Sequence, residues 1–186
     1  MSYKSRKFRE ANEAIKKNAS VKNPVGVFVG GTSGIGEHTA YAFAKYTDSP
    51  TIYIVGRNEE SAKRVIAKLK ELNPNPKSKF KFIKCDIGLV KEVDRLCSII
   101  SQQESKVNLV VNSAGYLGFD NNEQTTEGLN KKNAVYCYGK WRVILGLLTL
   151  LQAAVQLGEP ARSIIVHIAG QEGRIFTNDL DLKGGM

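Results

Sequence analysis

The chain has 186 residues, of which 42% are hydrophobic and 24% are charged, and its formal net charge at pH 7 is +9. This length suits one domain with a full hydrophobic core, and the composition excludes a disordered or fibrous protein. The three cysteines lie far apart, without a Cys-x-x-Cys pair, and there are two histidines, so the sequence supports neither a disulfide framework nor a metal site.

The positive charge is concentrated at the start of the chain. Residues 1–22 carry seven Lys or Arg and two Glu, a net of +5, and the rest of the chain carries +4. A basic arm could attract acidic partners, but apolar residues recur there at helical spacing, namely Phe8, Ala11, Ile15 and Ala19. This favours a leader helix over 1–22 docked on a single domain over 23–186, with no nucleic-acid partner. The segment is too polar for a signal peptide, so we expect a cytoplasmic protein.

From residue 25 onward, short β-rich runs alternate with amphipathic stretches, which indicates repeated βαβ units around a parallel sheet. The predicted strands are VGVFV (25–29), TIYIV (51–55), FKFIK (80–84), VNLVV (107–111) and SIIVHI (163–168). Right-handed crossovers give the strand order 3-2-1-4-5 with helices on both faces. The predicted fold class is therefore α/β, a Rossmann-type doubly wound parallel sheet of about five strands.

The helices between these strands are predicted from apolar stripes at helical spacing. The first stripe consists of Ile35, Thr39, Ala42, Phe43 and Tyr46. The second begins after Asn58, which suits an N-cap, and consists of Ala62, Val65, Ile66 and Leu69. The third consists of Leu89, Val93, Leu96 and Ile100. Each stripe is expected to cover a face of the sheet.

A long helix is expected near 128–157. Its longest apolar run, about 143–157, is shorter than the roughly 20 residues that a membrane-spanning helix needs and contains Gln152 and Gln156. The run therefore predicts a buried helix and no membrane partner. The same helix is the surface through which we expect copies of the chain to form a homo-oligomer.

A glycine-rich loop, GGTSGIG, follows the first predicted strand directly. Gly30, Gly34 and Gly36 are spaced G-x-x-x-G-x-G, and a helix is expected to begin near Ile35. Glycines allow a tight turn and a close approach of main-chain N–H groups to a pyrophosphate, and the helix points its positive end at the phosphates. A plain strand-to-helix turn is the alternative. The position between a strand and an amphipathic helix favours a nucleotide site.

At this loop the sequence resembles the short-chain dehydrogenase/reductase family, whose loop reads TGxxxGxG; Val29 stands where the family has Thr. CDIG, which contains Asp86, resembles the family's segment near the adenine. NSAG (112–115) resembles its NNAG, and TTEGL (125–129) opens the long helix as in many members. The resemblance runs from residue 25 to about 182. It implies a cofactor site formed by Gly30, Ser33, Gly34, Ile35, Gly36, Arg57, Asn58, Asp86, Ile87, Asn112, Ala114 and Gly115.

The end of the second strand discriminates between NAD and NADP. An NAD enzyme normally places Asp or Glu there to bind the ribose hydroxyls, whereas Arg suits a 2'-phosphate. This chain has Gly56 at that position and Arg57 next to it. Since a guanidinium matches phosphate geometry, NADP(H) is the expected cofactor; a solvated surface Arg57 is the alternative. Ser33 is not basic, so the second cation of some NADP-preferring members is absent.

The resemblance also implies where catalytic groups should stand. In the family a Tyr, paired with a Lys, is the general acid and base, a Ser orients the substrate oxygen, and an Asn supports a proton relay. Gly170 of HIAG stands in the place of the Ser and Tyr136 of AVYCYG in that of the Asn, and residues 171–186 contain no tyrosine. Tyr-x-x-x-Lys spacing occurs at Tyr3/Lys7, Tyr41/Lys45 and Tyr136/Lys140. Chance accounts for such pairs, but Tyr136 and Lys140 lie on an active-site helix and are candidate substitutes.

Further segments, HIAGQEGRI, DLDLK and AVYCYGKW, resemble a divergent group of fungal members, several linked to secondary metabolism, that can also lack the Ser. This implies an oxidoreductase acting on a small-molecule alcohol or ketone. Two readings stay open. One is an NADP-dependent oxidoreductase whose remaining part lies beyond residue 186; the other is a non-enzymatic NADP(H)-binding protein, a regulator or a degenerate relic. We expect the 186-residue chain alone not to reduce carbonyl compounds appreciably.

Overall fold

A computed structural model of the chain describes residues 21–115 and 123–166. Nearly all of the expected leader helix, residues 1–20, lies outside the described residues, as do the last two residues of the predicted strand 163–168 and the tail that follows.

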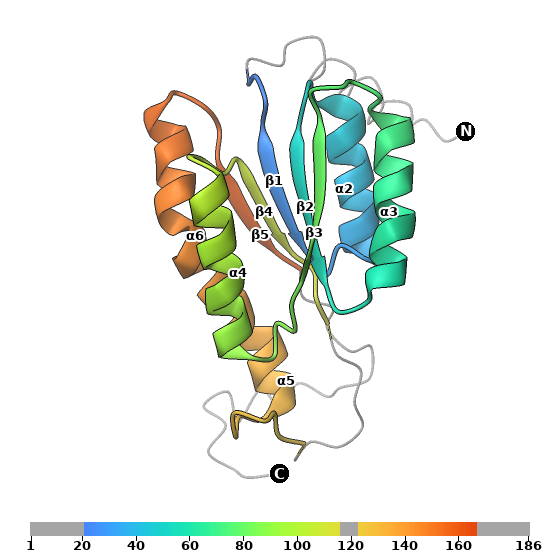
Figure 1. Cartoon of the computed structure of the whole chain (residues 1–186). Helices are drawn as coiled ribbons and strands as arrows, with labels where there is room; N and C mark the ends of the chain where they lie inside the picture. The colour runs from blue at the N-terminus through green and yellow to red at the C-terminus, as the bar shows by residue number, and fades with distance from the viewer. Residues whose placement is uncertain (1–20, 116–122, 167–186) are drawn as a thin grey trace, which may run out of the picture.

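The described residues form a parallel sheet of five strands in the order β3-β2-β1-β4-β5 (Figure 1). The strands are β1 (Val25–Val29), β2 (Thr51–Gly56), β3 (Lys79–Lys84), β4 (Leu109–Asn112) and β5 (Arg162–Ile165). The predicted fold class and strand order are confirmed. The sequence placed β4 two residues too early, because Val107 donates its N–H to Leu150 O rather than to the sheet, at 3.0 Å.

Helices cover both faces of the sheet (Figure 1). One face carries α2 (Gly34–Tyr46) and α3 (Glu59–Leu72); the other carries α4 (Val90–Gln103) and α6 (Gly139–Gln156). The short α5 (Lys131–Asn133) and a turn of π-helix (Ala134–Tyr138) lead into α6. Two apolar core clusters result, one between the sheet and α4 with α6 and one between the sheet and α2 with α3.

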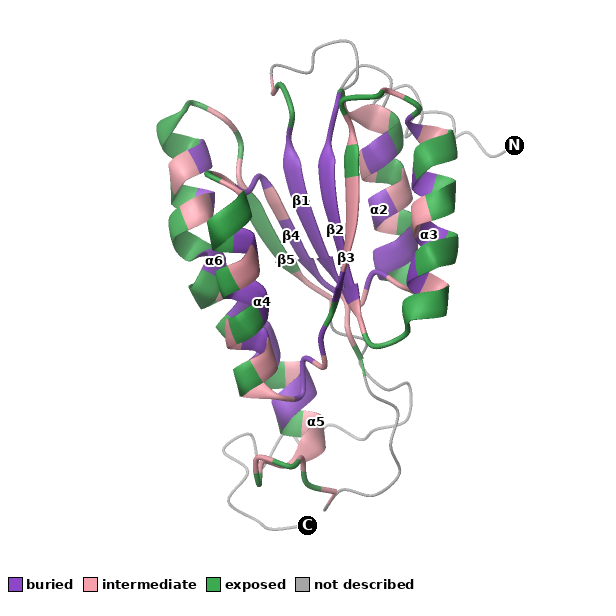
Figure 2. Cartoon of the chain, in the orientation of Figure 1, coloured by how far each residue is buried: buried purple, intermediate pink, exposed green. Residues whose placement is uncertain are grey.

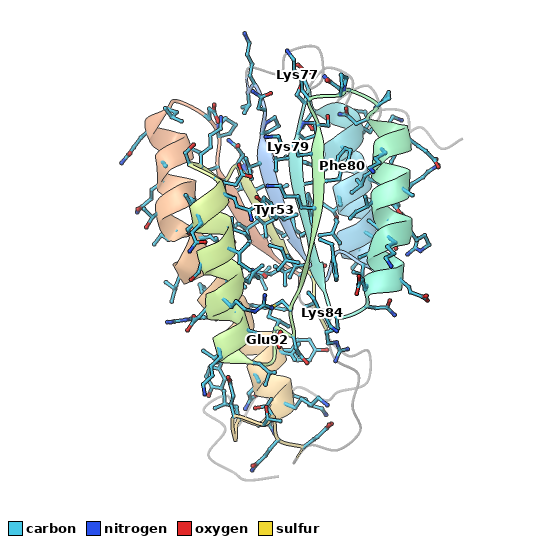
Figure 3. All side chains as sticks on the ribbon, viewed as in Figure 1. Tyr53, Lys77, Lys79, Phe80, Lys84 and Glu92 are labelled. Atoms are coloured by element: carbon cyan, nitrogen blue, oxygen red, sulfur yellow. The ribbon has the colours of Figure 1, made fainter. Side chains whose placement is uncertain are left out.

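Strand character follows position in the sheet. The central strands β1 and β2 are buried along almost their whole length (Figure 2), as expected for a parallel sheet covered on both faces. The edge strand β3 mixes apolar residues with lysines. Phe80 packs against the cluster beneath α2 and α3, whereas Lys79 and Lys84 are exposed (Figure 3). Lysines on an edge strand discourage pairing with another chain.

The predicted apolar stripe of α2 is confirmed only in part. Phe43 packs against the core cluster beneath α2 and α3, but the fully buried face of the helix is made of other residues. The buried residues of this helix are Gly36, Glu37, Ala40 and Ala44, and Ile35 is 49% exposed. Small residues face the sheet because they let the helix lie close to it. Ile35 belongs instead to the first turn, at the end of the helix next to the glycine loop.

The stripes of α3 and α4 are confirmed in their central residues. Ala62, Val65 and Leu69 are buried in α3, and Val93, Leu96 and Ile100 are buried in α4. Asn58 caps α3 as predicted, because its Oδ1 accepts the N–H of Ser61 at 2.9 Å.

The long helix is buried on one side only. Val143, Leu147 and Ala154 face the core, whereas Trp141 and Leu145 are more than half exposed (Figure 2). The continuous helical run Lys131–Gln156 contains an 18-residue stretch with a mean hydropathy of 1.3, which is long and apolar enough to cross a membrane. A core helix of a soluble protein meets the same two criteria, and α6 packs on α4 and the sheet.

Candidate functional site

A cavity of about 550 Å³ opens at the carboxyl ends of the central strands, within the size range of small-molecule sites. It lies at the point where the strand order reverses between β1 and β4, where doubly wound sheets bind their ligands. Nine predicted site residues line it: Gly30, Ser33, Gly34, Ile35, Arg57, Asp86, Ile87, Ala114 and Gly115.

Three predicted site residues do not line the cavity. Gly36 lies behind the loop, where an added Cβ would come within 2.5 Å of Gly30 O. Asn58 is occupied as the cap of α3. Asn112 is fully buried and donates its Nδ2 to Lys140 O at 3.4 Å, and no described residue pairs with its Oδ1.

The glycine loop is shaped to hold a group against its backbone. Gly30 has φ 80°, and a Cβ there would lie 2.5 Å from Ala114 N, so only glycine lets the ends of β1 and β4 meet. Gly34 has φ 57°, and a Cβ there would meet no atom within 4 Å among the described residues. The open side of Gly34 at the N-terminus of α2 fits a dinucleotide pyrophosphate, because free N–H groups and the positive end of the helix face it.

At the end of the cavity next to β2, Arg57 supplies a positive charge, and β2 itself ends in Gly56 and contributes no acidic side chain. A Cβ on Gly56 would lie 2.9 Å from Thr32 Cγ2, so Thr32 fills the space of a side chain at this position. The side chain of Arg57 is 64% exposed, and its Nη1 lies 3.9 Å from Asp86 Oδ2. Asp86 also accepts the N–H of Gly88 at 2.9 Å, which fixes its carboxylate beside the cavity.

Several lining residues were not selected from the sequence. Thr32, Ser113, Thr125 and Lys131 all line the cavity. Ser113 donates its hydroxyl to Val29 O at 3.1 Å, which fastens the end of β4 to that of β1. Three of the four could have been predicted from the sequence, because Thr32, Ser113 and Thr125 lie within the motifs GGTSGIG, NSAG and TTEGL. Lys131, which pairs with Glu123, carried no motif.

The candidate acid and base are close together but not paired through the hydroxyl. Lys140 is fully buried, its Nζ donates to Val166 O at 2.8 Å, and the same Nζ lies 5.2 Å from the centre of the Tyr136 ring. Burial lowers the pKa of Lys140, since desolvation penalises the charged form. The Tyr136 hydroxyl would lie 3.6 Å from a Cβ on Gly115. Tyr136 therefore lies beside the cavity, with the lysine over its ring.

The other candidates lie elsewhere. Tyr41, the first member of the Tyr41/Lys45 pair, is on α2. Its hydroxyl donates to Glu37 at 2.7 Å and does not lie at the carboxyl end of β5. Tyr3, Lys7 and Gly170 lie outside the described residues. Across residues 21–115 and 123–166, no group of three or more His, Cys, Asp or Glu is arranged to hold a metal ion.

Comparison with known proteins matches residues 25–175 to the short chain dehydrogenase family. Oxidoreductase AN1596 of Emericella nidulans is 42% identical over 164 residues, covering 88% of this chain and 47% of that protein. Oxidoreductase andH of Emericella variicolor is 41% identical over 174 residues, covering 94% of this chain and 49% of that protein. The chain thus spans about half the length of these curated relatives.

Solved structures share the fold at low sequence identity. The NADP complex of RhlG from Pseudomonas aeruginosa superposes with a TM-score of 0.62 at 21% identity, covering 78% of this chain and 55% of that one. The NADH-dependent reductase A1-R', complexed with NAD, gives a TM-score of 0.65 at 20% identity, covering 79% and 60%. Solved structures with this fold therefore include both an NADP complex and an NAD complex.

Proposed function

The chain belongs to the short-chain dehydrogenase family, and from that premise we propose that it binds NADP(H) for an oxidoreductase that interconverts an alcohol and a carbonyl compound. A nicotinamide cofactor follows from the family and its structural neighbours. The preference for the phosphorylated form and the alcohol or carbonyl substrate are part of the proposal.

One observation carries the preference for NADP(H). Gly56 ends β2 without a carboxylate, Thr32 fills the space that a side chain would occupy there, and Arg57 stands next in the chain at the cavity. A carboxylate would repel a 2'-phosphate, whereas a guanidinium binds it through charge-assisted hydrogen bonds. The solvent exposure of Arg57 supports this role, because the side chain is free to turn from Asp86 to a phosphate.

The reaction divides between cofactor and chain. NADPH, when bound, supplies a hydride to the carbonyl carbon. The glycine loop would hold the pyrophosphate and Asp86 the adenine side, while Ala114 and Gly115 form the wall near Tyr136. The substrate oxygen needs a proton, and the Tyr136 hydroxyl is the candidate donor among the described side chains at that wall.

A non-enzymatic NADP(H)-binding protein is the second candidate. Tyr136 stands where the family has the Asn of its proton relay, and Lys140 is engaged with Val166 O. A chain that holds the cofactor without completing the relay would act as a binding module.

We further propose that the protein is cytoplasmic, takes a small-molecule substrate in secondary metabolism, and does not bind nucleic acid.

Cofactor titration tests the proposal. The change in nucleotide fluorescence on binding gives the dissociation constants of NADPH and NADH, and we expect NADPH to bind more tightly. Arg57→Ala should weaken NADPH binding by about 10- to 150-fold, since a hydrogen bond to a charged group contributes roughly 1.5–3 kcal/mol. NADH binding should not change. Lys63→Ala, which removes an exposed cation on α3 outside the cavity, is the control. Equal affinities of the unaltered chain for NADPH and NADH would contradict the proposal.

Activity separates the enzyme from the binding module. NADPH consumption is measured with a panel of ketones and aldehydes, with Tyr136→Phe alongside. Turnover that Tyr136→Phe reduces by about 10²-fold or more supports a proton donor at this position. Tight NADPH binding without turnover of any carbonyl favours the binding module only when the full-length protein is assayed, because the 186-residue chain alone is expected to be inactive on either reading.

A further inference from the structure

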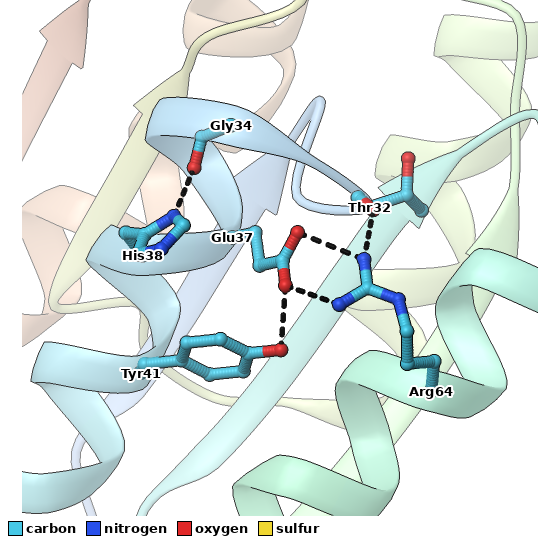
Figure 4. Close-up of polar contacts among 6 residues, drawn as sticks. All are labelled: Thr32, Gly34, Glu37, His38, Tyr41 and Arg64. Carbon is cyan, nitrogen blue, oxygen red and sulfur yellow. Dashed lines mark hydrogen bonds and ion pairs between the residues drawn. The ribbon is translucent and has the colours of Figure 1, made fainter.

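A four-residue polar network lies behind the glycine loop, where α2 and α3 meet (Figure 4). Arg64 on α3 donates from Nη1 to Glu37 Oε1 at 2.5 Å and from Nη2 to Glu37 Oε2 at 2.9 Å. Its Nη2 also donates to Thr32 O, the carbonyl of the loop, at 3.3 Å. Tyr41 donates its hydroxyl to Glu37 Oε1 at 2.7 Å.

The carboxylate fixes the arginine in one place. The Glu37 side chain is only 8% exposed, whereas that of Arg64 is 57% exposed. The hydrogen bond from Arg64 holds the pKa of Glu37 below its ordinary value, so the pair stays ionised at neutral pH. A nearly buried carboxylate without its partner is costly, and a two-pronged contact sets direction as well as distance. Arg64 is therefore held in a fixed orientation against the loop.

The contact with Thr32 O sets the orientation of a peptide unit of the loop. No cis peptide bond occurs among the described residues. In a trans peptide the carbonyl and the following N–H point to opposite sides. A carbonyl of Thr32 that is held toward Arg64 turns the N–H of Ser33 to the other side, and both Thr32 and Ser33 line the cavity. Ser33 is also the N-cap of α2, with no capping bond from its side chain.

We propose that Arg64 is a positioning residue for the cofactor: through Thr32 O, and held by Glu37, it keeps the Ser33 N–H turned toward the phosphate groups. The proposal rests on the proposed nicotinamide nucleotide site. It assigns to an arginine outside the glycine motif the task of organising the loop before the cofactor binds.

The competing explanation is a clamp between two helices. In that case the ion pair of Arg64 with Glu37 matters and the contact with Thr32 does not. Arg64→Lys separates the two roles, because a single ammonium preserves the charge opposite Glu37 but lacks the planar fork that reaches a carboxylate and a carbonyl together. Arg64→Met removes both contacts and keeps an unbranched side chain.

The experiment measures two quantities for each variant: the dissociation constants of NADPH and NADH by fluorescence titration, and the free energy of unfolding by urea denaturation. We expect Arg64→Lys to stay close to the unaltered chain in stability but to bind both cofactors about tenfold more weakly. The loss should be equal for NADPH and NADH, since both carry the pyrophosphate. Arg57→Ala, by contrast, should affect NADPH alone.

Two controls are matched to the network. Tyr41→Phe removes the other hydrogen bond to Glu37 and leaves Arg64 on Thr32, so cofactor affinity should not change. Lys68→Met removes an exposed cation from the same helix, where Lys68 pairs with Glu71, and should also leave affinity unchanged.

The outcomes separate this inference from the proposed function. An unaltered chain that binds neither cofactor overturns both. An unaltered chain that binds NADPH, together with Arg64→Lys of equal affinity, overturns the positioning role alone and leaves the helix clamp. Weak binding of both cofactors by a stably folded Arg64→Lys establishes it.

Discussion

Gly34 is a position where a substitution should affect cofactor binding much more than folding. Its φ is 57°, and an added Cβ would meet no atom within 4 Å among the described residues. We expect Gly34→Val to leave the fold intact, at a backbone cost of about 1–2 kcal/mol, while abolishing NADPH binding because its methyl groups occupy the place of the pyrophosphate. Fluorescence titration and urea denaturation measure the two effects.

Gly158→Val is the matched control. Gly158 has φ 74° and equally open surroundings, but it follows α6 and does not line the cavity. The backbone strain should therefore be similar and cofactor affinity should be preserved. If Gly34→Val binds NADPH as tightly as Gly158→Val does, the glycine loop is only a turn.

Lys140 gives the stability of the protein a pH dependence whose sign follows from its burial. Its folded pKa is lowered below the ordinary value of 10.5 by desolvation, so between the two values the unfolded chain binds more protons than the folded one. The contribution of this group to the free energy of unfolding therefore rises with pH across that window. We expect the stability of Lys140→Met relative to the unaltered chain to fall as pH rises toward 10.5.

Urea denaturation of both proteins at pH 7 and pH 10 measures this difference. Other groups that titrate at high pH, such as Cys85, whose pKa burial raises to about 12, contribute equally to both proteins and cancel. A difference in stability that does not change with pH would mean that Lys140 binds its proton as tightly in the folded chain as in the unfolded one.

Individual site residues were predictable where they belong to a contiguous motif. Gly30, Gly34, Arg57 and Asp86 were found from the loop and the strand ends and do line the cavity. Arg64 was not, because its link to Thr32 joins positions 32 residues apart and depends on the packing of α2 against α3. Spacing along the chain records neighbours within an element, but not those that two elements bring together.

At the scale of elements, α2 depends on small residues facing the sheet. Ala44 is fully buried against the cluster that includes Phe28, whereas Ala42, on the same helix, is exposed. We expect Ala44→Leu to lower the free energy of unfolding by about 1–3 kcal/mol, because the added carbons must displace packed neighbours. Ala42→Leu should change it by no more than about 0.5 kcal/mol. Urea denaturation distinguishes the two, and equal stabilities would contradict the close approach of α2.

The same packing explains which elements the sequence predicted well. Strands β1 and β2 are continuous apolar runs, and α3 has a wide apolar stripe, so their patterns are unambiguous. In α2 the fully buried face consists mainly of small residues, so hydrophobicity alone identified Phe43, which packs against the core, but not Ala40 and Ala44. The strand order was predictable because crossover handedness limits the topologies open to a βαβ chain.

At the scale of the whole molecule, the outer face of α6 carries an exposed apolar stripe. Its members recur at helical spacing and are Tyr138, Trp141, Leu145, Leu148 and Val155, all at least 40% exposed. The stripe extends for about 26 Å along the helix at 1.5 Å per residue. A hollow lined by Val90, Leu129 and Cys137 adjoins its first turn. Exposed apolar patches of this kind mark association surfaces.

We expect this stripe to pair with the stripe of a second copy, and its size determines how strongly. With a helix width of about 10 Å, the two stripes together would bury roughly 500 Å², below the roughly 1,000 Å² of a stable interface. Weak, concentration-dependent dimerisation should therefore appear in sedimentation velocity. Leu145→Glu places a charge in the middle of the stripe and should yield monomers at all concentrations. Ala42→Glu adds the same charge on the opposite face of the sheet and should leave association unchanged, and a dimer that survives Leu145→Glu must use another surface.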